Sequence, residues 1–178
     1  MPRLQVVSPD AAVGDVKEVY DTIEQRFGRV PNLIQALGNS PVALKAYVTL
    51  DALIAEGTLV PVEREIVRLI VSEYNQCHYC VAAHTLGCRA ASLSDREILE
   101  LRRGNAGNPR HAALAAFTRR VMETKGFVAD EDLRRFRDAG YEDQHVGEII
   151  TVIGQKTISN YFNHVHETEL DFPAAPEL

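Results

Sequence analysis

Apolar residues recur at helical spacing throughout the 178-residue chain, and this periodicity limits the possible folds more than any other feature. The longest run lies between Glu142 and His166. Its apolar residues are Val146, Ile149, Ile150, Val152, Ile153, Ile158, Tyr161 and Phe162. No segment alternates between apolar and polar residues for long enough, between turn residues, to indicate a strand. The sequence therefore predicts an all-α bundle, with the 142–166 helix as the spine of the core or of a subunit contact.

Residues that commonly begin and end helices divide the rest of the chain. Ser8–Pro9 and Ser40–Pro41 each combine an N-cap with a proline in the first turn, and Ser94 and Glu97 form a capping box. The expected helices cover residues 8–27, 30–37, 41–56, 63–74, a segment starting at 77, 94–104, 111–125, 131–139 and 142–166, with 58–62 as a connector. Prolines at 173 and 176 break helices, so residues 171–178 are expected to form an extended tail.

Length, composition and charge favour one domain over residues 1–178, large enough to bury a core without disulfides. The net charge of -6 and the absence of a basic cluster argue against a nucleic-acid or membrane partner. No apolar run approaches the roughly 20 residues needed to span a bilayer, and the N-terminus lacks an apolar signal segment, so we expect a cytoplasmic protein. Two of the three cysteines form one Cys-x-x-Cys, which indicates a redox or metal role rather than a secreted disulfide framework.

The stretch EIVRLIVSEYNQCHYCVAAH, residues 65–84, holds most of the reactive side chains. A helix that starts near Cys77 places both cysteines in its first turn, where unpaired N–H groups and the helix dipole favour thiolates. At about 100° per residue, Cys77, Cys80 and His84 fall within an arc of roughly 60° on one helix face. Residues three apart lie about 5 Å from each other, which is within the range for a disulfide. The spacing therefore predicts a thiol pair that can open and close with little backbone movement.

The spacing of Glu65, Cys77, Cys80 and His84 resembles the active-site motif of the alkylhydroperoxidase AhpD-like proteins, within the carboxymuconolactone decarboxylase family. All four motif positions match. The stretches FGRVPN, SPVALKAY and NYFNHVHETELDFP are also similar to the peroxidase-related branch of that family. The founding peroxidase has a histidine directly before its second cysteine, whereas this chain has Tyr79 there.

This resemblance implies an AhpD-like helical bundle, assembled as a homo-oligomer, often a trimer or hexamer. It also implies that the thiols reduce a hydroperoxide and that an external dithiol restores them, with no bound cofactor and no metal. Cys80 matches the peroxidatic cysteine and Cys77 the more exposed resolving one. Glu65 and His84 match a proton relay that works through a water.

Two further expectations concern the surroundings of the motif. Glu65 lies on a helix rich in aliphatic residues, where burial would raise its pKa and let it accept a proton near neutral pH. His84 would then relay the proton taken from Cys80. Tyr79 and His78 are expected to shape the pocket, with Tyr79 the better candidate for contact with substrate. Cys88 is expected to pack in the core.

Other functions remain open at this point. The two thiols and His84 could bind zinc, although structural zinc requires a fourth ligand and the sequence offers no second Cys-x-x-Cys. A third hypothesis is a general thiol-disulfide oxidoreductase, but the Cys-x-x-Cys of that class usually follows a strand in a βαβ unit. A fourth is a redox sensor whose disulfide changes assembly without turnover. Zinc content, thiol counts and peroxide consumption distinguish these readings.

Overall fold

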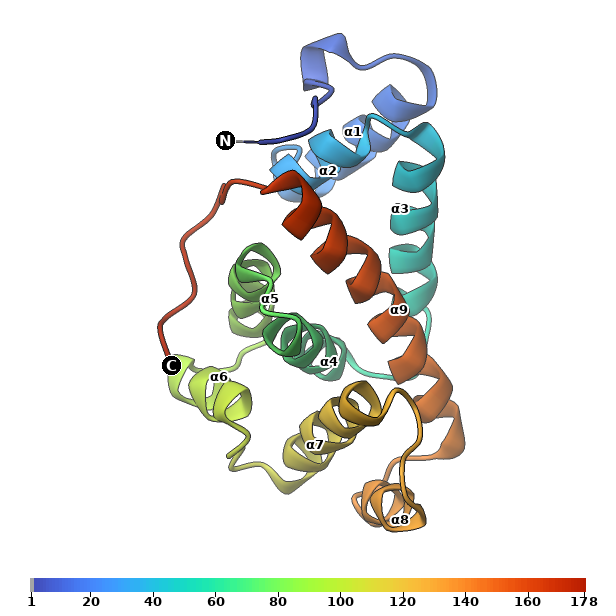
Figure 1. Cartoon of the computed structure of the whole chain (residues 1–178), viewed down its shortest axis with the longest axis vertical. Coiled ribbons are helices and arrows are strands. Elements are labelled where there is room, and N and C mark those ends of the chain that lie inside the picture. The colour runs from blue at the N-terminus through green and yellow to red at the C-terminus, as the bar shows by residue number, and fades with distance from the viewer. Residues whose placement is uncertain (1) are drawn as a thin grey trace.

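The computed structural model describes residues 2–178, and within them it contains helices and no strand (Figure 1). The elements in chain order are the 3-10 turn η1 (Pro9–Ala11), α1 (Gly14–Phe27), α2 (Asn32–Leu37), α3 (Pro41–Ala55), α4 (Pro61–Tyr74), α5 (His78–Ala90), α6 (Asp95–Arg103), α7 (Pro109–Thr124), α8 (Asp130–Asp138) and α9 (Asp143–His166). The all-α prediction is confirmed.

Capping residues act as the sequence predicts at several helix ends. Ser94 Oγ accepts a hydrogen bond from the Glu97 backbone N–H at 3.3 Å, and the Glu97 carboxylate accepts one from the Ser94 N–H at 2.8 Å. This reciprocal pair satisfies backbone donors that the first turn of α6 leaves free. Gly104 ends α6 with a φ of 82°, a left-handed conformation that glycine adopts without strain.

Several predicted helix starts differ from the structure, including those of α1 and α4. Ser8 and Pro9 begin only the three-residue turn η1, and α1 begins at Gly14. Ala12 is extended and Gly14 has a φ of 54°, so the backbone changes direction between the two elements instead of continuing as one helix. Helix α4 begins at Pro61, inside the expected connector, because a proline at the first helical position needs no N–H partner.

Helix α4 lies at the centre of the molecule and packs against α5, α7 and α9 (Figure 1). Its residues Ile66, Val67 and Leu69 are completely buried, as expected for a helix whose apolar stripe is covered by several neighbours. Helix α9 crosses the molecule diagonally and contacts α2, α3, α4 and α5. It therefore brings its side chains to both ends of the fold.

The buried apolar side chains form two clusters. The larger one joins α4, α6, α7, α8 and α9 and includes Cys88. The smaller one joins α1, α2, the start of α3 and the first turn of α5, and it includes Cys77 and Cys80. Helix α5 thus extends from one cluster to the other, and the reactive thiols lie in the smaller one.

The chain after α9 runs past α5 toward α6 without forming a helix or a strand (Figure 1). Asp171 accepts hydrogen bonds from the Tyr79 hydroxyl and the Asn32 N–H, and Phe172 packs against the Tyr79 ring with centroids 4.8 Å apart. Arg102 donates to the Pro176 carbonyl oxygen at 2.5 Å. These contacts hold residues 171–176 against the body of the protein.

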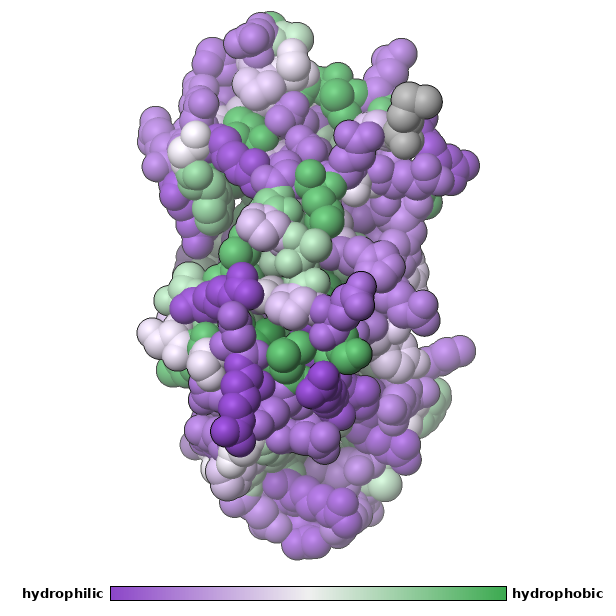
Figure 2. Space-filling model, turned by 90° about the vertical axis from the view of Figure 1, so that its left-hand side faces the viewer, coloured by the Kyte–Doolittle hydropathy of each residue, from purple (hydrophilic) through white to green (hydrophobic). Residues whose placement is uncertain are grey.

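The face that carries this segment is mostly hydrophilic, with hydrophobic residues gathered near its middle (Figure 2). Among the helices of residues 2–178, none combines the length and apolar character needed to cross a membrane.

Candidate active site

The turn between α4 and α5 sets the position of the two thiols. Gln76 has a φ of 56°, which reverses the chain, and the Cys77 N–H then donates to the Ser72 carbonyl oxygen at 2.9 Å. Cys77 is the N-cap of α5 and Cys80 is the third residue of that helix. Both thiols therefore lie where backbone N–H groups and the helix dipole favour negative charge, as the sequence predicts.

Asn163 on α9 connects the two sulfurs. Its Nδ2 donates to Cys80 Sγ at 3.2 Å and lies 3.8 Å from Cys77 Sγ. Ser159 Oγ lies 3.8 Å from Cys80 Sγ. Both cysteines are only 1% exposed. Helix α9 and the smaller apolar cluster cover both thiols, and the expectation that Cys77 is the more exposed of the two stays a prediction.

The two thiols differ in acidity because they share one hydrogen bond. The Cys77 thiol donates to Cys80, and this bond raises the pKa of Cys77 and lowers that of Cys80. Burial opposes ionisation of Cys80, but the positive charge of Lys156 and the Ser159 hydroxyl also lower its pKa. Cys80 is thus the thiol held as a thiolate, and Cys77 keeps its proton.

Glu65 and His84 meet directly across α4 and α5. Glu65 Oε2 lies 2.9 Å from His84 Nδ1, and Glu65 Oε1 accepts a bond of 2.7 Å from Arg68 Nη1. Arg68 also donates to Asp51 on α3 at 2.7 Å. The carboxylate is therefore bound on one side by an imidazole and on the other by a guanidinium.

The expected raised pKa of Glu65 is wrong. Burial alone would raise it, but His84 and Arg68 together lower the pKa of Glu65 to about 2. A carboxylate at neutral pH can only accept hydrogen bonds, so His84 presents its N–H at Nδ1 and keeps the lone pair of Nε2 free. Burial and the charge of Lys156 lower the pKa of His84, which keeps the ring neutral. Glu65 orients a base rather than acting as one.

Gly87 permits this approach of the two helices. A Cβ at Gly87 would collide with Oε2 of Glu65, the oxygen that faces His84. Cys88 follows it and is fully buried in the larger apolar cluster, where burial raises its pKa to about 12. Cys88 therefore packs in the core, as predicted, and stays a thiol.

The sequence-based reasoning missed the contribution of α9. Lys156, Ser159 and Asn163 are all buried, and they are spaced three and four residues apart, so they share one helix face. Helix α9 therefore directs a cation, a hydroxyl and an amide toward the thiols. The available signal was the spacing of these polar residues, which places them among the core positions of an otherwise apolar helix. From its sequence, the segment is predicted only as a long amphipathic helix.

Tyr79 and His78 flank the thiols differently. The Tyr79 hydroxyl donates to Asp171 at 2.9 Å and accepts from the Leu33 N–H at 3.3 Å. The hydroxyl therefore binds the C-terminal segment. His78 is exposed at the start of α5. Substrate contact by these two residues stays a prediction.

No group of three or more His, Cys, Asp or Glu side chains within residues 2–178 is arranged to hold a metal ion. The arrangement is instead that of a buried thiolate beside an oriented base.

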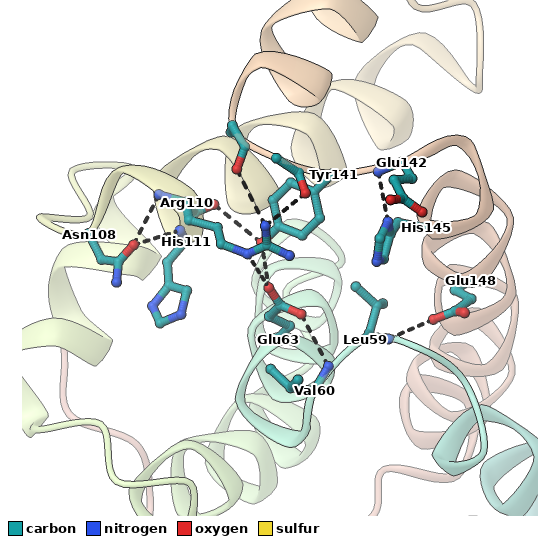
Figure 3. Close-up of polar contacts among 12 residues, drawn as sticks. Leu59, Val60, Glu63, Asn108, Arg110, His111, Tyr141, Glu142, His145 and Glu148 are labelled. Atoms are coloured by element: carbon teal, nitrogen blue, oxygen red, sulfur yellow. Dashed lines mark hydrogen bonds and ion pairs between the residues drawn. The ribbon is translucent and has the colours of Figure 1, made fainter.

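A second carboxylate of α4, the buried Glu63, lies two residues nearer the start of the helix than Glu65 (Figure 3). It accepts hydrogen bonds from Arg110 Nε at 2.8 Å, the Tyr141 hydroxyl at 2.9 Å and the Val60 N–H at 3.1 Å. The Arg110 guanidinium also lies 4.0 Å from the centroid of the Tyr141 ring. This cluster joins α4 to α7 and to the segment before α9.

The chain matches known proteins in both sequence and structure. Residues 41–124 match the carboxymuconolactone decarboxylase family. An alkyl hydroperoxide reductase of Mycobacterium tuberculosis is 32% identical over 94 residues, which are 52% of this chain and 27% of that relative. The match thus spans about a quarter of the relative's length.

Two solved structures share the fold over nearly the whole chain. A peroxidase-related protein from Ralstonia eutropha with an alkylhydroperoxidase AhpD core has a TM-score of 0.87 at 23% identity, covering 96% of this chain and 92% of that one. The debrominase Bmp8, in complex with 2,3,4-tribromopyrrole, has a TM-score of 0.78 at 18% identity, covering 96% and 94%. Residues 41–124 are thus similar to the carboxymuconolactone decarboxylase family, and the chain has the fold of AhpD-like peroxidase-related proteins.

Proposed function

We propose that the protein is a thiol-dependent hydroperoxide reductase whose reactive pair is Cys77 and Cys80. One observation carries this proposal: the Nδ2 of Asn163 donates to the buried Cys80 sulfur and also lies within 3.8 Å of the Cys77 sulfur, in a site where Glu65 orients His84. A low-pKa thiolate with a second thiol within bonding reach is the arrangement required for reversible two-electron chemistry.

In the first step the Cys80 thiolate attacks the terminal oxygen of a hydroperoxide. An S–O bond forms and the O–O bond breaks, so that Cys80 becomes a sulfenic acid and the other oxygen leaves as an alkoxide. The alkoxide takes one proton and departs as the alcohol. The free Nε2 of His84 can pass this proton from solvent to the alkoxide, with Glu65 holding the ring in place.

In the second step the Cys77 sulfur attacks the sulfenic sulfur of Cys80, which forms the disulfide and releases water. An external dithiol then reduces the bridge, and the dithiol itself becomes a disulfide. The reaction needs no cofactor and no metal beyond this reductant. Both sulfurs are buried in the structure, so the reductant must be small or must displace covering side chains to reach Cys77.

The same chemistry is consistent with the named relatives. The alkyl hydroperoxide reductase of Mycobacterium tuberculosis supports a hydroperoxide substrate, although the match covers 27% of its length. The debrominase Bmp8 shares the fold, so halogenated pyrroles form a useful second arm of a substrate panel. Cys77 and Cys80 are the residues on which either reductive reaction would depend.

We also propose that the protein assembles as a homo-oligomer, a trimer or a hexamer, as the family resemblance implies. The outer face of α9 supports this proposal, because several of its large apolar side chains are about half exposed. These residues are Ile150, Ile158, Tyr161 and Val165. Sedimentation velocity tests it, and a monomer at micromolar concentration would contradict it.

The decisive test of function is peroxide consumption with a panel of dithiol reductants and hydroperoxides. We expect turnover in the wild type, its loss in Cys80→Ser, and one round of oxidation without recycling in Cys77→Ser, which should trap the sulfenic acid. Cys88→Ser is the matched control, because Cys88 is buried apart from the reactive pair, and it should retain turnover.

Unimpaired peroxide consumption by Cys80→Ser would contradict the proposal. Stoichiometric zinc that blocks both thiols would instead support the metal-binding reading. A peroxide-dependent change in oligomer size without turnover would support the sensor reading.

A further inference from the structure

Lys156 is a buried cation that the mechanism above does not use. It is 2% exposed, in the middle of α9, and it takes part in none of the ion pairs found within residues 2–178. Its Nζ lies 6.0 Å from the centroid of the Tyr47 ring on α3. Burial of an ammonium group without an anionic partner is costly, so a charge of this kind calls for an explanation.

The helix geometry directs Lys156 toward the thiols. Ser159 and Asn163, three and seven residues further along α9, both reach Cys80 Sγ, at 3.8 Å and 3.2 Å. Residues at these spacings lie on one helix face, so Lys156 occupies the same face one turn earlier. The Ser159 hydroxyl also donates to the Lys156 carbonyl oxygen at 3.2 Å.

The other charges around the thiols are already balanced. Arg68 on α4 is bound to Glu65 and to Asp51, and Asp51 is partly exposed and also lies 3.9 Å from Arg26. His84 on α5 is kept neutral, since burial and Lys156 lower its pKa. Among the buried groups, this leaves the ammonium of Lys156 and the sulfur of Cys80 as the two whose charges can offset each other.

We propose that the Lys156 ammonium is the counter-charge of the Cys80 thiolate and that it makes the Cys77–Cys80 disulfide easier to reduce. This proposal rests on the proposed thiol chemistry but concerns a residue outside the motif. Lys156 acts through the thiolate, so it is a positioning residue rather than a catalytic one.

The effect on reduction follows from the charge balance. Reducing the disulfide adds two electrons from the external dithiol and one proton, and yields the Cys80 thiolate and the Cys77 thiol. The new negative charge appears beside Lys156, whereas the disulfide leaves the ammonium without an anion. Burial alone would lower the pKa of Lys156, but Tyr47 and the Cys80 sulfur raise it, so the lysine is charged at neutral pH. The ammonium thus stabilises the reduced form over the oxidised form.

The test compares Lys156→Met, which removes the charge at nearly constant length, with Lys156→Arg, which keeps it. Lys17→Met is the matched control, because Lys17 is an exposed lysine of α1 whose removal changes the net charge equally. Two quantities are measured without any peroxide: the apparent pKa of the thiolate from its ultraviolet absorbance, and the thiol-disulfide equilibrium against glutathione.

We expect the apparent thiolate pKa to rise by about one unit or more in Lys156→Met, because one unit corresponds to a tenfold change in ionisation. The disulfide should become about tenfold harder to reduce, equivalent to about 30 mV for this two-electron couple. Lys156→Arg should restore most of both effects, and Lys17→Met should match the wild type.

Thermal unfolding separates a structural role from the proposed one. In the disulfide form the Lys156 ammonium has no anionic partner, and replacing an unpaired buried charge with an apolar side chain is often neutral or stabilising, so oxidised Lys156→Met should unfold at or above the temperature of the oxidised wild type. Should this variant fail to fold, Lys156→Gln provides the same two measurements with a neutral polar side chain.

A folded Lys156→Met or Lys156→Gln would overturn the inference if its thiolate pKa stayed within about 0.3 unit of the wild type and its glutathione equilibrium within about twofold. Both measurements are independent of peroxidase turnover. If the wild type consumes no hydroperoxide while Lys156→Met shows the expected shifts, the proposed function fails and the role of Lys156 stands.

Discussion

Two glutamates on α4, the buried Glu63 and the partly buried Glu65, lie two residues apart and yet have different surroundings. Glu63 is bound by Arg110, Tyr141 and a backbone N–H, in a cluster that joins three parts of the chain (Figure 3). Glu65 points to the other side of the helix, where it is bound by Arg68 and His84. Both carboxylates have a lowered pKa despite their burial.

The comparison shows that a perturbed pKa does not identify a catalytic residue by itself. The partners of Glu63 are a guanidinium, a phenol whose pKa is raised and an amide, and none of these exchanges a proton near neutral pH. Glu65 faces an imidazole, which does, and the same site contains the thiols. The two glutamates differ in whether a side chain bound to the carboxylate can itself gain or lose a proton near neutral pH.

Neutralising each glutamate in turn should separate the two roles most strongly. Glu65→Gln removes the charge that orients His84, and we expect peroxidase kcat/KM to fall on the order of 10³-fold, as for loss of a well-placed acid-base group. Glu63→Gln should leave kcat/KM within about threefold of the wild type. Steady-state kinetics with one hydroperoxide and one dithiol measure both. Equal losses in the two variants would remove the distinction.

Low pH should destabilise the protein chiefly through protonation of the Glu65 carboxylate. The folded-state pKa of Glu65 is about 2 against an ordinary 4.5, so its stabilisation is complete above pH 4.5 and is lost as the pH falls toward 2. The loss is on the order of 3 kcal/mol. His84 acts in the same direction below pH 6.5, because its lowered pKa means that the unfolded chain binds the proton first.

Urea unfolding between pH 7 and pH 3 measures this dependence. The unfolding free energy of the wild type should fall as the pH is lowered. It should fall less steeply in Glu65→Gln than in Glu63→Gln, since the pKa of Glu65 is lowered further than that of Glu63. A steeper dependence in Glu65→Gln than in Glu63→Gln would show that the Glu65 carboxylate of the wild type is not the group whose ionised form the fold stabilises.

A substitution at Gly87 can displace the Glu65 carboxylate without changing residue 65 itself. In Gly87→Ala the new Cβ would push the carboxylate away from His84, because it would occupy the space of Oε2. We expect kcat/KM to fall by about 10²-fold, the size seen when a catalytic group is displaced by about 1 Å. Gly147→Ala is the control, because a Cβ there meets nothing within 4 Å. Its activity should be that of the wild type.

Removing the Glu63 cluster should affect stability and leave the chemistry intact. Glu63→Leu deprives the buried Tyr141 hydroxyl and the Val60 N–H of their acceptor, which costs about 2 kcal/mol. Arg110 is 42% exposed and can turn to water, so its loss of a partner adds little. Chemical unfolding measures the difference. An unchanged unfolding free energy would mean that the cluster contributes nothing to folding.

The helices and the motif were predictable because their signals are local. The Ser94 and Glu97 capping box and the glycine at 104 define α6 from neighbouring residues alone. The spacing of Cys77, Cys80 and His84 fixes a shared helix face without knowledge of the tertiary fold.

What the sequence could not predict depends on contacts between distant segments. The low pKa of Glu65 depends on His84 from α5 as well as on Arg68, and the burial of the two thiols depends on α9, which covers them. Lys156 was missed because a lysine in a long helix is usually solvated, and only the packing of α9 shows that this one is buried.

The most direct test of the account is the fate of the three cysteines after one equivalent of cumene hydroperoxide, followed by thiol labelling and mass spectrometry. The account predicts that the number of free thiols falls from three to one, with Cys77 and Cys80 joined as a disulfide and Cys88 unmodified. Three free thiols after full consumption of the peroxide, or oxidation confined to Cys88, would contradict it.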